Sequence, residues 1–394
     1  MSKAITEVKL CYDLKRLPTV QHRAGLGGLA FLLESLHSDG VLPEETYALQ
    51  DEKLELRLSK DILSKVLGYL YAGIEVTRLM NSKPKGEDFE EVELPTADGK
   101  TVKKFAYKDR RPAGSWLSRC GYGEEWLALW QDGIWSTLRD KPASREIYKA
   151  PVEELANKLW KAFEAVEKGK TVALDLASAL YIGGRAKSNE DVSFDGMPAH
   201  VFLLHFAHAL AQPFKVIGLN SLGDRTYPGL VWVYPEPRDL RYFIRNMREY
   251  LGTRTESDEE GTSRTRFYSS TRVTMPAEAG LVVLEMALSA TKTEAISGAF
   301  CAQLDKQGNN VNLLAVAHIP ADRKLIRRYS EEVAPISNYA LKKMVLANLL
   351  KGAPLYRGAA KLMSVLPASS VLSLGKDGQA FSFNSLHLLN HLGE

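Results

Sequence analysis

Alternation of apolar and polar residues predicts strands in the N-terminal and central parts of the chain. Apolar side chains recur at every second position over residues 6–14 and 54–58, which is typical of strands with one buried face. Residues 214–219, 230–234 and 311–319 form short apolar runs, which favour more deeply buried strands. The pattern therefore distributes strands over most of the chain.

Helical periodicity fills the stretches between these strands. Leucines at spacings of three and four predict a helix over residues 21–37, and Ser59 is a suitable N-cap for a helix that ends near Tyr71. Further helices are predicted over residues 123–138, 152–167, 239–251, 337–350 and 355–366. We therefore expect an α+β fold, an irregular mixed body with antiparallel strands and a more helical C-terminal third.

Polar segments predict turns and boundaries. Asp98-Gly99 lies between the polar runs 87–94 and 101–107, and this dipeptide is a strong hairpin signal, so we expect a protruding hairpin. Residues 252–271 are the most polar stretch and are expected to form an exposed loop or linker. The expected organisation is an N-terminal α+β body over 1–251, the polar segment 252–271 and a mainly helical region over 272–394.

Glycines in residues 25–30 match the spacing of a dinucleotide-binding fingerprint. In that motif a strand runs directly into the glycine turn, whereas the preceding strand is predicted to end near Leu14 and residues 15–23 intervene. The arrangement does not suit a nucleotide, and we expect no cofactor. Close packing of this helix against a sheet or a neighbouring chain explains the glycines better.

The composition is that of an ordinary globular protein, with 45% hydrophobic and 25% charged residues among 394. Fifty-one basic and 48 acidic residues leave a net charge of +3, which does not by itself demand a polyanionic partner. No run approaches the ~20 apolar residues of a membrane span, and the N-terminus lacks the apolar segment of a signal peptide. We expect a cytoplasmic chain without a membrane partner. Cys11, Cys120 and Cys301 are too far apart for C-x-x-C chemistry.

Three histidines, His200, His205 and His208, are the main candidates for an enzymatic site. A zinc site normally adds a carboxylate or cysteine ligand at matching spacing, and residues 209–214 offer none. No Gly-x-Ser-x-Gly elbow is present. Core or interface histidines are the favoured interpretation, and a hydrolase or metalloenzyme that uses this region stays an alternative.

Basic residues are concentrated in three segments although the net charge is small. Residues 101–150 hold ten basic and six acidic residues, residues 238–272 hold eight arginines and no lysine, and residues 321–361 hold nine basic and three acidic residues. Arginine offers a planar fork that suits phosphate and guanine. Arg241, Arg245 and Arg248 recur at helical spacing and predict one cationic face, for which salt bridges to neighbouring acids are the alternative explanation.

Three stretches resemble a known family. Residues Leu17–Leu29 resemble the N-terminal signature of the myxan-type large subunit of type I CRISPR effector complexes. Arg111–Gly114 and Trp126–Pro142 continue in that family's pattern, and Tyr227–Pro237 is a weaker echo. The stretches follow one another in the order that the family shows.

The resemblance implies a non-catalytic subunit of a Cascade-type complex. Such a subunit holds the 5′ end of the crRNA, recognises the protospacer-adjacent motif in double-stranded DNA and promotes R-loop formation. Guide pairing reads the sequence, while the protein reads the flanking motif and the backbone shape. The expected partners are crRNA, target double-stranded DNA, the backbone, handle-binding and small subunits of Cascade, and a downstream helicase-nuclease or transposition adaptor.

Two sets of binding residues are expected. The RNA set combines the N-terminal signature with a recurrent basic loop and comprises Gln21, His22, Arg23, Arg139, Lys141 and Arg145. The DNA set follows from side-chain chemistry, because arginine and lysine suit phosphates, arginine suits guanine and asparagine suits adenine. It comprises Lys108, Arg110, Arg111, Asn189, Asn220, Arg225, Arg241, Arg245, Arg248, Arg264 and Arg266.

Two further questions stay open from the sequence. One is whether the chain is instead an assembly scaffold that touches guide RNA and sister subunits but never DNA. The other concerns the C-terminal region, because members of the family usually continue into a helical bundle that a separate small subunit would otherwise supply. The residues do not choose between interference and transposition as the output.

Overall fold

The computed structural model describes most of the chain. The described residues are 5–84, 88–95, 99–114, 127, 130–131, 133–134, 147–148, 152–176, 180–182, 195–219, 225–252, 255–257, 263–265, 272–291, 295–307, 310–336 and 338–365. Helices and mixed sheets are combined in one structure, so the predicted α+β class is confirmed.

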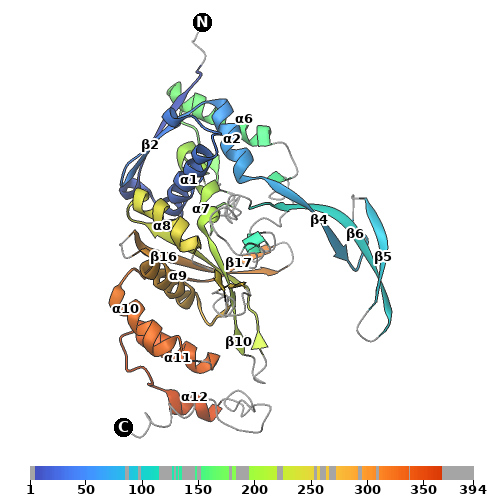
Figure 1. The fold of residues 1–394 in the computed structure, drawn as a ribbon, viewed down its shortest axis with the longest axis vertical. Coiled ribbons are helices and arrows are strands. Elements are labelled where there is room, and N and C mark those ends of the chain that lie inside the picture. The colour runs from blue at the N-terminus through green and yellow to red at the C-terminus, as the bar shows by residue number, and fades with distance from the viewer. Residues whose placement is uncertain are drawn as a thin grey trace.

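The core is a five-stranded mixed sheet in the order β15-β9-β12-β16-β17 (Figure 1). Neighbouring strands are antiparallel except β15 and β9, which run parallel. The strands β9, β12 and β17 confirm the apolar runs singled out in the sequence, whereas β15 and β16 were not predicted. The five strands come from both sides of residues 252–271. Their bounds are β9 (Gln212–Val216), β12 (Leu230–Pro237), β15 (Arg272–Val273), β16 (Ile296–Gln307) and β17 (Asn310–Pro320).

Helices cover both faces of this sheet. On one face the Tyr234 hydroxyl of β12 is hydrogen-bonded to His208 Nδ1, 2.7 Å away, which places α7 there beside α1. On the other face Gly280 of α9 lies against the side chains of Cys301 and Ile319. Trp232 and Tyr234 are fully buried between these layers. The covering helices are α1 (Val20–Ser38), α7 (Pro198–Leu210), α8 (Leu240–Gly252) and α9 (Pro276–Thr291).

A second sheet lies near the N-terminus, in the order β1-β3-β2. The side-chain oxygen of Ser59 accepts a hydrogen bond from the Ile62 N–H at 3.2 Å, so the predicted N-cap of α2 is confirmed. The elements of this region are β1 (Val8–Asp13), the 3₁₀ turns η1 (Leu14–Arg16) and η2 (Glu44–Thr46), β2 (Tyr47–Leu49), β3 (Lys53–Leu58), α2 (Lys60–Leu70) and α6 (Val152–Glu167).

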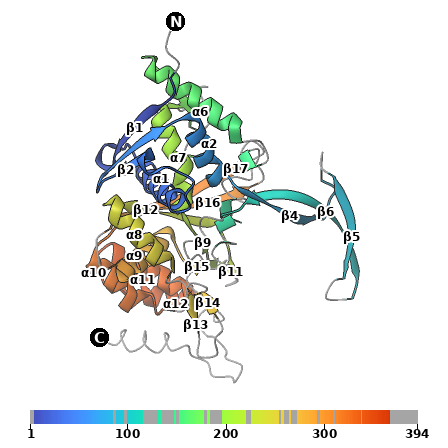
Figure 2. The ribbon, with the colours of Figure 1, turned by 45° about the horizontal axis from the view of Figure 1, so that its top comes forward.

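A three-stranded arm stands clear of the body, as Figures 1 and 2 show. Its order is β4-β6-β5, with every pair antiparallel. The predicted hairpin is confirmed by β5 and β6, and Gly99 at its turn has a φ of 77°, which only glycine adopts without strain. The polar pattern missed the third strand. The bounds are β4 (Gly73–Met80), β5 (Phe89–Pro95) and β6 (Thr101–Pro112).

The segment 252–271 is not wholly a loop, because two of its short stretches pair as strands. Three two-stranded antiparallel ladders occur in the described residues: β7 (Leu174–Asp175) with β8 (Asp195–Gly196), β10 (Gly218–Leu219) with β11 (Arg225–Thr226), and β13 (Thr255–Ser257) with β14 (Ser263–Thr265).

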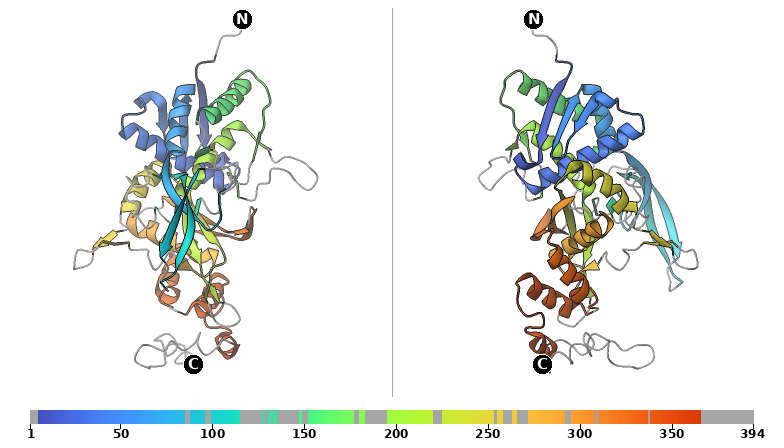
Figure 3. Two further views of the ribbon diagram at one scale, coloured as in Figure 1. Left: turned by 90° about the vertical axis from the view of Figure 1, so that its right-hand side faces the viewer. Right: turned by 60° about the vertical axis from the view of Figure 1, so that its left-hand side comes forward.

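A buried carboxylate attaches the C-terminal helices to α9. Glu278, in the first turn of α9, accepts hydrogen bonds from the Thr274 N–H at 2.6 Å and hydroxyl at 2.7 Å. Lys342 of α11 pairs with the other oxygen at 2.7 Å, and the Tyr329 hydroxyl donates to it at 3.3 Å. Figure 3 shows these helices, in red, at the end of the molecule opposite the N-terminal elements. They are α10 (Arg323–Arg328), the π-helical turn η4 (Tyr329–Val333), α11 (Tyr339–Leu350) and α12 (Ala359–Val365).

Glycines let α1 approach α7 backbone to backbone. A Cβ atom at Gly25 would overlap the carbonyl of Leu203, and one at Gly28 would overlap the carbonyl of Phe206. A Cβ at Gly27 would lie 2.7 Å from Pro237 Cγ. The glycines of this segment therefore serve close packing, as the sequence pattern predicted. Gly25 and Gly28 pack against another helix, however, where a sheet or a neighbouring chain was expected, and Gly27 packs against Pro237 of β12.

We expect Gly28→Ala to lower the free energy of unfolding by about 1–3 kcal/mol, because the added methyl group forces α1 away from α7. Gly68→Ala is the matched control, since Gly68 also lies in a helix but a Cβ there meets no atom within 4 Å. Without a clash, this second change should raise stability by up to about 1 kcal/mol. Urea unfolding of the full chain measures both, and equal effects would contradict the packing argument.

Candidate nucleic-acid interface

The first turn of α1 positions the three N-terminal residues of the expected RNA set. Gln21 is buried, and its amide group is used within the chain. Its Oε1 accepts from the Ile182 N–H at 3.0 Å, and its Nε2 donates to the Ile182 carbonyl at 3.3 Å. The side chain therefore ties residues 180–182 to α1, and its contact with RNA stays a prediction.

His22 is also buried, beside two other rings. Its Nδ1 is hydrogen-bonded to the Thr19 hydroxyl at 2.8 Å, and its ring centroid lies 5.5 Å from that of His200 and 6.0 Å from that of Tyr181. Burial, helped by the nearby His200, lowers the pKa of His22 to about 4. The ring is neutral at pH 7 and brings no positive charge to a phosphate.

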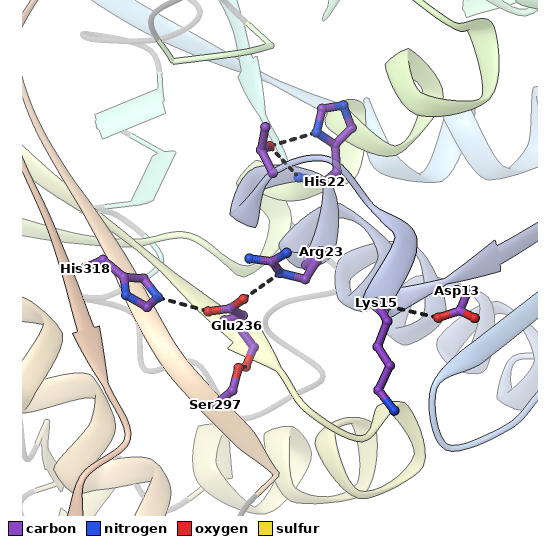
Figure 4. A network of polar contacts seen from close by, with 8 residues as sticks. Asp13, Lys15, His22, Arg23, Glu236, Ser297 and His318 are labelled. Carbon is purple, nitrogen blue, oxygen red and sulfur yellow. Dashed lines mark hydrogen bonds and ion pairs between the residues drawn. The ribbon is translucent and has the colours of Figure 1, made fainter.

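Arg23 joins α1 to the central sheet through a carboxylate (Figure 4). Its Nε lies 2.5 Å from an oxygen of Glu236 on β12. The other oxygen of Glu236 lies 3.0 Å from His318 Nε2 on β17, and the Ser297 hydroxyl donates to the Glu236 carbonyl at 3.3 Å. The Arg23 side chain is 27% exposed and that of Glu236 is 11% exposed. This charge is thus balanced inside the protein.

We expect Arg23→Met to lower the free energy of unfolding by about 2–3 kcal/mol, because it leaves the nearly buried Glu236 carboxylate without its main counter-charge. Methionine keeps an aliphatic stem, so the change mainly tests the charge. Adding Glu236→Gln should recover most of the loss, as measured by urea unfolding of the single and double variants. No recovery in the double variant would show that packing, and not the ion pair, holds these elements together.

Stability should also depend on pH through His22. The unfolded ring binds a proton near pH 6.5 and the folded ring only near pH 4, so lowering the pH from about 6.5 to about 4 favours unfolding. Between about pH 6.5 and pH 4, we expect the free energy of unfolding to fall less in His22→Gln than in the native chain. Below about pH 4 the difference between the two proteins should not change further. Urea unfolding at several pH values measures this, and parallel pH profiles for the two proteins would contradict it.

The arm carries three residues of the expected DNA set, and the strand register sorts them onto its two faces. Lys108 and Arg110 of β6 point to one face together with Lys104, because side chains at every second position share a face. Arg111 lies on the opposite face with Lys103 and Asp109. Sequence reasoning omitted Lys104 from the DNA set, although its spacing of two from Lys108 and Arg110 in the predicted hairpin is the signal that would have found it.

Acidic neighbours balance only some of these cations. Lys108 pairs with Glu75 at 2.7 Å, Lys103 pairs with Glu91, and Arg78 pairs at 3.0 Å with the buried Asp109. Neither Lys104 nor the Arg110 side chain has an acidic partner among the described residues. Gly73 leaves room for the Arg110 stem, since a Cβ there would lie 2.9 Å from Arg110 Nε. We call the face with Lys104, Lys108 and Arg110 the cationic face of the arm.

Arg241 and Arg245 of α8 are both exposed, but only Arg241 has a side-chain partner among the described residues. The Arg241 guanidinium donates two hydrogen bonds to the Leu49 carbonyl, at 3.1 and 2.9 Å, and thereby braces α8 against β2. Arg245, one turn later, is exposed and has no acidic partner in the described part of the chain. Arg248 follows on the same helix.

The remaining predicted residues are placed only in part. Arg225 lies in β11 and Arg264 in β14. The residues outside the described parts of the chain are Asn189, Asn220 and Arg266 of the DNA set and Arg139, Lys141 and Arg145 of the RNA set.

The three histidines of α7 face three different neighbourhoods. His205 Nδ1 is hydrogen-bonded to the Tyr71 hydroxyl at 2.6 Å, His208 to Tyr234, and His200 packs against His22. Both His205 and His208 are buried. Among the described residues, no three histidine, cysteine or carboxylate side chains gather as ligands of a metal ion would. The favoured interpretation as core histidines fits this placement.

Two protein-family models match the chain. The model described as the type I-B CRISPR Cas8b N-terminal domain matches residues 44–296, and the Cas8b C-terminal domain matches residues 296–392. The first match alone covers more than half of the chain. The chain belongs to the type I-B CRISPR Cas8b family. It is therefore a large subunit of a type I CRISPR complex of the Cascade type, which contains other Cas proteins.

The boundary between the two Cas8b matches coincides with the first residue of β16, inside the central sheet. The signature at residues 17–29 precedes the matched region. No curated protein matches the chain. Within the described residues, no helix of this Cas8b-family chain combines the length and apolar character needed to cross a membrane.

Proposed function

We propose that this Cas8b-family chain is the non-catalytic, myxan-type large subunit of its Cascade, which holds the 5′ end of the crRNA, recognises the protospacer-adjacent motif in double-stranded DNA and promotes R-loop formation. The observation that carries the proposal is the Cas8b match, which extends over residues 44–392. The general mechanism of RNA-guided recognition supports the proposal, because base pairing with the guide RNA recognises the target sequence and the protein has to bind the flanking duplex.

The cationic face of the arm is the proposed DNA contact. It stands clear of the body, so a duplex can approach it without displacing other elements. Neither Lys104 nor Arg110 forms a salt bridge among the described residues, although Glu75 lies opposite Arg110 in the strand register and pairs with Lys108, so binding a phosphate breaks no ion pair of either residue. Arg245 on α8 offers a second exposed cation. The first turn of α1 would contribute to crRNA binding indirectly. The buried Gln21 and His22 and the ion-paired Arg23 would fix the position of α1 and thereby the surface that meets the 5′ end of the crRNA.

We expect Lys104→Ala and Arg110→Ala to weaken binding of the assembled complex to target duplexes several-fold each. Each lost phosphate contact should reduce the slope of log affinity against log salt by about 0.9. Lys103→Ala is the matched control: it removes the same charge from the neighbouring residue, but Lys103 lies on the opposite face and is paired with Glu91.

The readout is filter binding or fluorescence anisotropy at several salt concentrations, with crRNA retention measured in the same preparations. Equal losses of DNA affinity for Lys103→Ala and Lys104→Ala would show that only the net charge matters. This result would contradict a specific contact of DNA with the cationic face of the arm. Intact assembly with unchanged DNA binding in all variants would favour the scaffold function, in which the chain touches guide RNA and sister subunits only.

A further inference from the structure

The outer edge of the central sheet is open at β17. This strand runs for 11 residues and pairs with β16 along one side. Its other side has no strand partner in the described part of the chain. A free edge presents a row of backbone N–H and C=O groups that another extended chain can pair with.

The side chains of β17 do nothing to discourage such pairing. Residues 310–320 contain no aspartate, glutamate, lysine or arginine. Leu313, Leu314 and Val316 are 44%, 48% and 56% exposed. Soluble proteins normally protect long edges with charges, prolines or short strands, because an uncharged apolar edge promotes association.

Every other edge strand of the three larger sheets is protected in one of these ways. Charged residues occur along β1, β4 and β5, as in Lys9, Glu75 and Glu91. The other two edge strands, β2 and β15, are only three and two residues long. Among the described residues, β17 is therefore the one long edge without this protection, which makes it a candidate for pairing with another molecule.

The strand is also anchored to neighbouring elements near its C-terminal end. His318 contacts Glu236, which binds Arg23 of α1, and Ile319 packs against Gly280 of α9. Anchored from both faces of the sheet, the edge offers a fixed template. A partner strand then loses less conformational entropy than it would on a mobile edge.

The chemistry of the edge selects its occupant. A row of free backbone N–H and C=O groups pairs best with an extended polypeptide. The exposed Leu313, Leu314 and Val316 favour a partner strand that carries apolar side chains at alternate positions. The absence of any cation along β17 disfavours a nucleic acid. We propose that β17 pairs with an uncharged, apolar, extended segment of another protein subunit of the Cascade-type complex, which adds a sixth strand to the sheet. This rests on family membership and not on the proposed DNA contacts.

Hydrogen–deuterium exchange of the assembled complex and of the free chain tests the pairing. We expect backbone amides of residues 310–320 to exchange more slowly in the complex. Val316→Lys should abolish this protection and reduce co-purification with the other Cas subunits, because it places a charge against an apolar strand. Val166→Lys is the matched control, since Val166 is 45% exposed on α6, away from this edge.

Both variants should melt like the native free chain, because both side chains are largely exposed. Unchanged exchange at residues 310–320 on assembly, or equal assembly of the two variants, would overturn the proposal. Slower exchange of residues 310–320 in the free chain at higher concentration would also overturn the proposal, because it would identify a second copy as the occupant. Slower exchange produced by crRNA alone would overturn it as well. DNA affinity of the Lys104 variants is measured separately, so failure here leaves the proposed function standing, and the reverse also holds.

Discussion

The contact between α1 and α7 is the constraint on which the rest of the structure depends. Gly25 and Gly28 bring the α1 backbone against the carbonyls of Leu203 and Phe206, a distance that any side chain would prevent. Because α1 is almost entirely buried, its position fixes the three residues of its first turn. It also fixes one face of the sheet, where Glu236 meets Arg23. A shift of one helix would therefore separate the N-terminal elements from β12 and β17.

Several charged side chains of this chain are neutralised by opposite charges within the protein, and a few cations have no such partner among the described residues. Arg23, Arg78 and Lys342 each neutralise a buried or nearly buried carboxylate, and each joins separate elements. Arg241 serves the same end with a carbonyl. A charge used in this way cannot meet a phosphate without loss of stability. The cations that remain for a partner are those without a salt bridge among the described residues, and this criterion separates Lys104 from Lys103 although they are adjacent in sequence.

Two parts of the surface therefore suit partners of different chemistry. The arm presents cations and stands clear of the body, whereas the edge at β17 presents backbone groups and apolar side chains. Between them lies a rigid core in which β16 and β17, from the Cas8b C-terminal match, complete a sheet begun by β9 and β12. The proposed nucleic-acid contact and the proposed protein contact therefore lie on separate parts of the described structure.

The sequence by itself determined the local features. Alternation and helical periodicity identified β1, β3, α1, α2 and α6 near their observed bounds, and Asp98-Gly99 identified the hairpin, because these signals depend on neighbours in the chain. The glycines at 25–28 indicated close packing without naming the partner helix.

Only the tertiary structure decided which charges are available. In the sequence, Arg23 and Arg241 look like cations without a partner in the chain. In the structure Arg23 pairs with Glu236, and the exposed Arg241 donates to the Leu49 carbonyl, and these partners are about 190 to 210 residues away along the chain. The open edge at β17 was equally invisible, since an apolar strand in the middle of a sheet and one at its edge have the same local pattern. Pairing across such distances is set by how the whole chain packs, and no local pattern records it.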